Sequence, residues 1–172
     1  MGRASANWPY LTLPIVIKTH LLVIRSDAAR RSNPEFTVTL NTSTEIIQPS
    51  KSEKLLGGIM AQNLKFTEHI QDHEDSMLKA LNSRINALKK VSHSASFKTR
   101  KTVANGIIIS RLIYLIPLWS GCQKYLMNSL QVMQNKAARV VTRRGKRTPT
   151  KALLMQCGWL RMAQLSVYHS LV

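Results

Sequence analysis

The side chains best suited to catalysis in this chain are its eight carboxylates. Enzymes that transfer phosphoryl groups often hold a pair of metal ions between acidic residues. Here no two aspartates stand side by side between two predicted strands. Asp72, Glu74 and Asp75 lie early in a predicted helix, where acidic side chains interact favourably with the helix dipole. We therefore predict that the chain has no catalytic residues of its own.

Two histidines and two cysteines are the other candidates for metal chemistry. His69 and His73 are four residues apart, so both could face one metal from a helix. The glutamate that follows the first histidine in zinc proteases is missing, and no third ligand is apparent. Cys122 and Cys157 are far apart in the sequence and indicate neither a zinc site nor a disulfide framework. We expect no metal ion or other cofactor bound to this chain.

The positive charge is the strongest signal in the sequence. The formal net charge is +17, and of the 25 Lys and Arg residues only eight precede residue 76. The remaining 17 share their segment with no acidic residue, because the last carboxylate is Asp75. Such a surface favours a polyanion as its partner, and nucleic acid is the commonest one. A basic surface that meets only counterions, or an acidic neighbour, is the alternative.

The cations form two clusters along the second half of the chain. One flanks a loop at residues 92–96, and the other lies at the end of a predicted helix that runs to about residue 142. Cations at a helix C-terminus are favourable in any case, and a solvated face is an alternative for each residue. The second cluster also resembles a nuclear localisation signal. We predict nucleic-acid contact for Lys89, Lys90, Lys98, Arg100, Lys101, Arg139, Arg143, Arg144, Lys146 and Arg147.

The elements that must position these residues fall into two parts. Residues 1–63 contain short apolar runs with strand character, interrupted by a polar stretch at 26–34. Gly57 and Gly58 indicate a turn or a close backbone approach. We expect a small antiparallel sheet formed by residues 18–24, 36–40, 44–49 and 54–61.

Residues 64–172 change to a helical period. Apolar residues recur at steps of three, four or seven, as in Ile70, Met77, Leu81, Ile85 and Leu88. Thr148 before Pro149 resembles a helix start, and Gly158 a helix end. The predicted fold class is α+β, with a β-hairpin region followed by a mostly helical bundle. We expect helices at 66–91, 97–116, 123–142, 149–158 and 159–172, the last with Leu160, Val167 and Leu171 on one face.

Neither apolar segment of the chain fits a membrane or export function. Residues 8–17 carry two prolines and no cleavage pattern of small residues, so we expect no signal peptide. Residues 103–119 are interrupted by Asn105, Arg111 and Pro117, which favours a buried helix over a membrane span. The predicted location is inside the cell, in the nucleus or cytoplasm.

Several segments together resemble the region downstream of the catalytic centre in reverse transcriptases of non-LTR (LINE-type) retrotransposons. The similar segments occur in the same order and at similar spacing over residues 11–172. They are LTLPIVIKTHLLVI (11–24), SEKLLGGIMAQNLKFTEHI (52–70), RLIYLIPLW (111–119), LQVMQNKAARVVT (130–142) and ALLMQCGWLRMAQLSVYHS (152–170).

The resemblance implies the late palm at residues 1–63 and a helical thumb and connection at 64–172. The thumb would lie along a template–primer duplex of RNA, DNA or a hybrid. Lys18 would approach the incoming nucleotide or the leaving pyrophosphate, and Gly57 and Gly58 would let the backbone pass near the primer. Nucleic acid, and the fingers and remaining palm, are the partners this implies.

The sequence also departs from that family. The Tyr/Phe-x-Asp-Asp motif has no counterpart, Pro14 lies near the place of the Asn that precedes the Lys-Thr pair, and no endonuclease or ribonuclease H pattern follows. We therefore expect a truncated RNA-directed DNA polymerase that is inactive alone, with Mg²⁺ required only by a complete enzyme. A stand-alone, non-catalytic nucleic-acid-binding module is the alternative, and a protein that binds nothing is a third.

Overall fold

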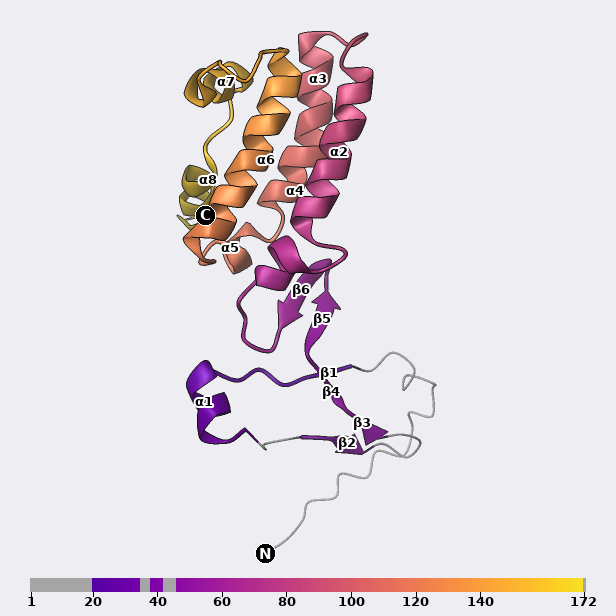
Figure 1. Cartoon of the computed structure of the whole chain (residues 1–172), viewed down its shortest axis with the longest axis vertical. Coiled ribbons are helices and arrows are strands. Elements are labelled where there is room, and N and C mark those ends of the chain that lie inside the picture. Colours follow the sequence, from indigo (N-terminus) through magenta and orange to yellow (C-terminus); the bar gives the residue numbers. More distant parts are fainter. Residues whose placement is uncertain (1–19, 35–37, 42–45, 172) are drawn as a thin grey trace, which may run out of the picture.

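The computed structural model describes residues 20–34, 38–41 and 46–171. Lys18, predicted to lie near the nucleotide, falls outside these residues. In Figure 1 the chain runs from a strand-containing N-terminal part, through a β-hairpin, into an elongated bundle of helices. The predicted α+β class is confirmed, with short two-stranded sheets and mostly helical content.

Within the described residues, the strands form three separate pairs rather than the single antiparallel sheet we expected. β1 (Leu21–Leu22) pairs in parallel with β4 (Pro49–Ser50), and β2 (Leu40–Asn41) pairs antiparallel with β3 (Ile46–Ile47). The chain bends at Lys51, between β4 and β5. The polar stretch 26–34 contains helix α1 (Asp27–Ser32), which the sequence analysis did not predict. Its start is capped by Ser26, whose Oγ accepts a hydrogen bond from the Ala29 amide at 3.1 Å.

The third pair is a tight hairpin that connects the N-terminal part to the bundle. β5 (Ser52–Leu55) and β6 (Gly58–Ala61) are joined by Leu56 and Gly57, with Leu55 opposite Gly58. Both loop residues have positive φ, 49° at Leu56 and 80° at Gly57. Two-residue hairpin loops favour this conformation because its twist matches that of the strands. The turn predicted at Gly57 and Gly58 is therefore present, one residue earlier than the pair itself.

The helix predicted at 66–91 is divided in two. A π-helical turn, η2 (Glu68–Asp72), ends at His73, which has extended backbone, and α2 (Met77–Val91) begins after Ser76. The His73 Nδ1 accepts a hydrogen bond from the Asp75 amide at 3.0 Å, which gives the backbone a partner outside the helix. Both parts still bury the predicted residues, because Ile70 and the α2 residues Met77, Leu81, Ile85 and Leu88 all lie in the core.

The helix predicted at 97–116 is also interrupted. It consists of α3 (Phe97–Ala104), a π-helical turn η3 (Asn105–Ile109) and α4 (Ser110–Ile113). It stops at Tyr114, whose backbone is extended, and Leu115 then adopts a left-handed conformation with φ 56°. Pro117 lies in the first turn of α5 (Ile116–Trp119), where its missing N–H costs nothing. It therefore begins a helix instead of ending one.

The remaining helices follow the sequence pattern closely. α6 spans Lys124–Thr142, as predicted, and α7 spans Thr150–Cys157, with Pro149 rather than Thr148 at its cap position and Gly158 at φ 67° after its end. The last helix, α8, covers Met162–Leu171 and starts three residues later than expected. Its predicted apolar face is exposed at Leu160, Val167 and Leu171, while Met162 is fully buried.

The core lies where α6 meets its neighbours. α6 packs against α2, α3, α7 and α8, and Figure 1 shows it at the centre of the bundle with α7 and α8 on its flank. Ala137 and Ala138 are completely buried in α6, and such small side chains allow neighbouring helices to approach closely. Trp119 closes the hairpin end of the core, and its Nε1 donates to the Tyr114 carbonyl at 3.0 Å. The bundle therefore has one continuous core that packs α2, α3 and α6 together.

Candidate nucleic-acid interface

The two predicted cation clusters meet at one end of the bundle. Two adjoining hollows lie there, one along the end of α2 and the loop after it, and the other between that region and the end of α6. We call them together the α2–α6 groove. It is lined by Asn86, Lys89, Lys90, Ser92, His93, Arg139, Val140, Arg143 and Arg144. Residues about 50 positions apart in the sequence thus share one surface.

The groove is positive because cations gather at its rim. The C-termini of α2 and α6 both point to this end, and their partial negative charge stabilises these cations while offsetting part of their charge. The sequence offers no acidic residue after Asp75 to neutralise these cations. Lys89, Lys90 and Arg144 are exposed, so their charges face solvent. An anionic ligand is the natural complement of such a surface.

The Arg143 side chain helps to form the groove by donating hydrogen bonds to the backbone of the loop after α2. It follows α6 in a left-handed conformation with φ 54°, and its side chain crosses to the loop after α2. Its Nε donates to the Ser92 carbonyl at 3.1 Å, and its Nη2 donates to the carbonyls of Ser92 and His93, the latter at 2.6 Å. A fourth, longer contact joins Nη2 to the Ala95 carbonyl at 3.4 Å.

Arg100 is buried, which corrects its prediction as a surface contact. Only 6% of the residue is exposed, and its Nε donates to the Val141 carbonyl at 2.8 Å. Its Nη1 donates to the Ala95 carbonyl at 2.5 Å. Burial, and then the nearby charge of Arg143, lower the pKa of Arg100. Arg100 is therefore used to join α3, α6 and the loop, and cannot reach a ligand in this conformation.

Of the other predicted cations, only Arg139 lines the groove. Lys98 is exposed in the first turn of α3, and Lys146 and Arg147 are exposed in the connection between α6 and α7. Lys101 is half-buried beside the C-terminal end of α7, where a Cβ on Gly158 would lie 3.4 Å from its Nζ. Arg139 is half-buried in the groove wall, and its Nη1 donates to the Asn135 carbonyl at 3.3 Å.

His93 and Asn86 are groove residues that the sequence analysis missed. His93 lies in the loop between Lys90 and Lys98 and is exposed in both hollows. Its position between the two halves of a basic cluster was the available signal. Asn86 stands one helical turn before Lys89 and Lys90, but a single polar residue on an exposed helix face gives no signal of its own.

The hairpin glycines lie at the opposite end of the bundle from the groove (Figure 1). A Cβ on Gly58 would come within 2.9 Å of the Leu115 side chain, so this glycine lets the hairpin close on the turn before α5. The Tyr114 hydroxyl donates to the Leu56 carbonyl at 2.6 Å and fastens the hairpin loop. The hairpin glycines are therefore used in packing the hairpin on the bundle, and no contact brings them to the cations of the groove.

Two carboxylates and a histidine near the hairpin have interaction partners within the chain. Lys54 contacts Asp75 at 2.7 Å and Lys65 contacts Asp27 at 2.6 Å, and each lysine lowers the pKa of its carboxyl partner. His69 is buried, and its Nδ1 accepts a hydrogen bond from the Ile59 amide at 3.2 Å. Because η2 ends before His73, the two histidines do not share a helical face. Within the described residues no group of three or more His, Cys, Asp or Glu could hold a metal ion.

Two further observations bear on the class of protein. No described helix is both long and apolar enough to cross a membrane. Comparison of the chain with protein-family models, curated proteins and solved structures finds no match in any of the three. The functional assignment therefore depends on the residues of this chain and their geometry.

Proposed function

We propose that this chain binds the phosphate backbone of nucleic acid through the α2–α6 groove. The observation that carries the proposal is that Lys89, Lys90 and Arg144 line two adjoining hollows, in a segment without a single acidic residue. Phosphate contacts of this kind attract polyanions by charge and carry no sequence information themselves. Binding is expected to be similar for many base sequences.

We further propose that the chain is the late palm, thumb and connection region of a reverse transcriptase from a non-LTR retrotransposon. The order and spacing of the similar segments support this, as does a helical bundle that follows a hairpin. In that setting the groove would contact a template–primer duplex. Nucleotidyl transfer would need metal-binding carboxylates from other residues, because the sequence of this chain has no adjacent pair of aspartates.

The test is the binding of the folded chain to a fluorescent RNA–DNA hybrid across a salt series. Each phosphate contact is expected to contribute roughly 0.9 to the slope of log affinity against log salt concentration, so affinity should fall steeply between roughly 50 and 200 mM salt. Polyglutamate of similar charge serves as the control for general attraction to anions. Absence of binding at low salt, from a chain shown to be folded, would overturn the proposal.

A primer-extension assay with added nucleotides tests the proposal that the chain is part of a reverse transcriptase. The chain alone should extend no primer. Primer extension should appear only when a palm fragment with the metal-binding carboxylates is supplied. Primer extension by the chain alone would contradict the assignment of catalysis to other residues.

A further inference from the structure

We infer that Arg100 and Arg143 are positioning residues of the α2–α6 groove. They act through the loop at residues 92–95, which they hold against the end of α6. This inference deepens the proposed function and depends on it, because it concerns how the same groove recognises phosphate. It also divides the predicted cations into two kinds, those that face the ligand and those that hold the others in place.

The two guanidinium groups belong to different elements, and both donate hydrogen bonds to the loop. Arg143, immediately after α6, donates to the carbonyls of Ser92, His93 and Ala95. Arg100, from α3, donates to the Ala95 carbonyl and to the Val141 carbonyl in the last turn of α6. These side chains therefore join the loop backbone to the end of α6, and they add to the packing of α2 on α6 that sets the width of the groove.

The loop in turn places the ligand-facing side chains. His93 belongs to the loop and lines both hollows, and Lys89 and Lys90 lie in the last turn of α2 directly before it. The core holds α2 as far as Leu88, so release of the loop can fray only the last turn, where Lys89 and Lys90 would lose their common orientation toward Arg139 and Arg144. The geometric requirement is specific to arginine, since a planar guanidinium can donate to several carbonyls at once and an ammonium is a point charge.

The electrostatic arrangement supports the same division. The two arginines are close enough for the charge of Arg143 to lower the pKa of Arg100, and their donors point at carbonyl oxygens rather than at carboxylates. Arg144 is the neighbouring residue in the chain and is exposed, and its side chain makes no hydrogen bond within the described residues. Arg143 and Arg144 are thus a matched pair that differ in what their side chains contact.

The test compares Arg143→Lys with Arg144→Lys. Both substitutions keep the formal charge, and Lys tolerates the left-handed backbone at position 143 as well as Arg does. Each variant is titrated with the labelled hybrid across the salt series, and amide hydrogen exchange is measured for residues 92–96 without nucleic acid. Circular dichroism establishes that each variant is folded at the assay temperature.

We expect Arg144→Lys to bind within about twofold of the original chain, with an unchanged salt slope. Arg143→Lys should bind about tenfold more weakly, and its slope should fall by roughly two although no charge is lost, because Lys89, Lys90 and His93 are no longer held together. Exchange of the loop amides should accelerate in Arg143→Lys alone. A merely structural role would lower the melting temperature and leave the salt slope unchanged.

Equal binding and equal slopes for the two variants would overturn the inference. If Arg143→Lys melts below the assay temperature, Arg100→Lys replaces it. That side chain is buried and cannot contact the ligand, so a reduced slope supports positioning and an unchanged slope contradicts it. Failure of the original chain to bind the hybrid would overturn the proposed function instead, and the loop exchange rates would still show whether Arg143 holds the loop.

Discussion

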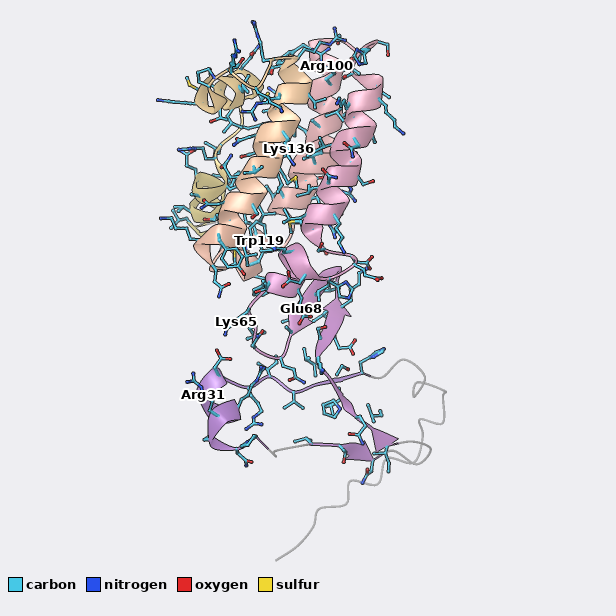
Figure 2. All side chains as sticks on the ribbon, in the orientation of Figure 1. Arg31, Lys65, Glu68, Arg100, Trp119 and Lys136 are labelled. Atoms are coloured by element: carbon cyan, nitrogen blue, oxygen red, sulfur yellow. The ribbon has the colours of Figure 1, made fainter. Side chains whose placement is uncertain are left out.

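The two ends of the bundle both carry cations, but the cations have different partners. At the hairpin end, Lys54 and Lys65 contact the carboxylates of Asp75 and Asp27. At the groove end, Arg100 and Arg143 contact backbone carbonyls, and other cations face solvent. Figure 2 shows Arg100 at one end of the bundle and Lys65 and Glu68 near the other.

This difference shows why a count of charges is a weak guide to a binding surface. A lysine that already contacts a carboxylate brings little net charge to a ligand, and a guanidinium that donates to three carbonyls is held by the fold. Only the cations that lack both kinds of partner remain for phosphate. The comparison therefore predicts that substitutions of the same type have different effects at the two ends.

The largest expected effect concerns stability. Leu130 is completely buried in the bundle core, whereas Leu55 in the hairpin is 59% exposed. Leu130→Ala should lower the free energy of unfolding by about 3 kcal/mol, because it removes buried apolar surface and leaves a cavity. Leu55→Ala should cost less than about 0.5 kcal/mol. Urea unfolding measures both, and a cost at Leu55 equal to that at Leu130 would show that the exposed hairpin residue is buried in solution.

The next effect concerns binding and tests the comparison directly. Replacing Lys89, Lys90 and Arg144 together by Gln should weaken binding of the RNA–DNA hybrid roughly 10- to 100-fold near 0.1 M salt, and the salt slope should fall by roughly three. The matched control replaces Lys51, Lys54 and Lys65 by Gln, which removes the same formal charge at the hairpin end. It should change affinity by less than about threefold. Equal losses in the two triple variants would mean that net charge alone drives binding.

The sequence predicted the core and the basic surface better than it predicted which cations face solvent and which are bound to the backbone. Periodic burial of Met77, Leu81 and Leu88 is a repeated local signal, so it was readable from spacing alone. The interruptions of the helices at His73 and Leu115 could not be predicted from spacing. The first involves the His73 side chain, which accepts a hydrogen bond from a backbone amide, and the second involves a single left-handed residue. Tertiary contacts determine such interruptions, so the spacing of apolar residues in the sequence gives little sign of them.

The same limit applies to the groove. Arg143 and Arg144 are adjacent and identical in type, and nothing in the sequence separates them. Their roles differ because the left-handed backbone at Arg143 turns its side chain to the loop after α2, a contact between residues about 50 positions apart. The pairing of hairpin cations with Asp27 and Asp75 likewise depends on contacts between distant segments.

The smallest expected effect is on pH dependence at the hairpin end. Burial, and then the charge of Arg111, lower the pKa of His69 from its ordinary value of 6.5. The unfolded chain therefore binds a proton at His69 more readily than the folded chain does. As the pH falls below about 6.5 toward the lowered pKa, the folded state loses stability, by at most about 1.4 kcal/mol per pH unit.

His69→Gln removes this proton-binding site and retains an acceptor for the Ile59 amide. Urea unfolding of both proteins at pH 7.5 and 5.5 should show a smaller loss of stability in the variant. The other histidines are common to both proteins and cancel in the difference, while Asp27 and Asp75, whose lowered pKa values lie below 3.8, titrate outside this range. Equal losses would place His69 in a solvated site. A smaller loss in the variant would show that acid acts on the packing of the hairpin against the bundle, whereas salt acts on ligand binding at the groove, so that the two ends respond to different solution conditions.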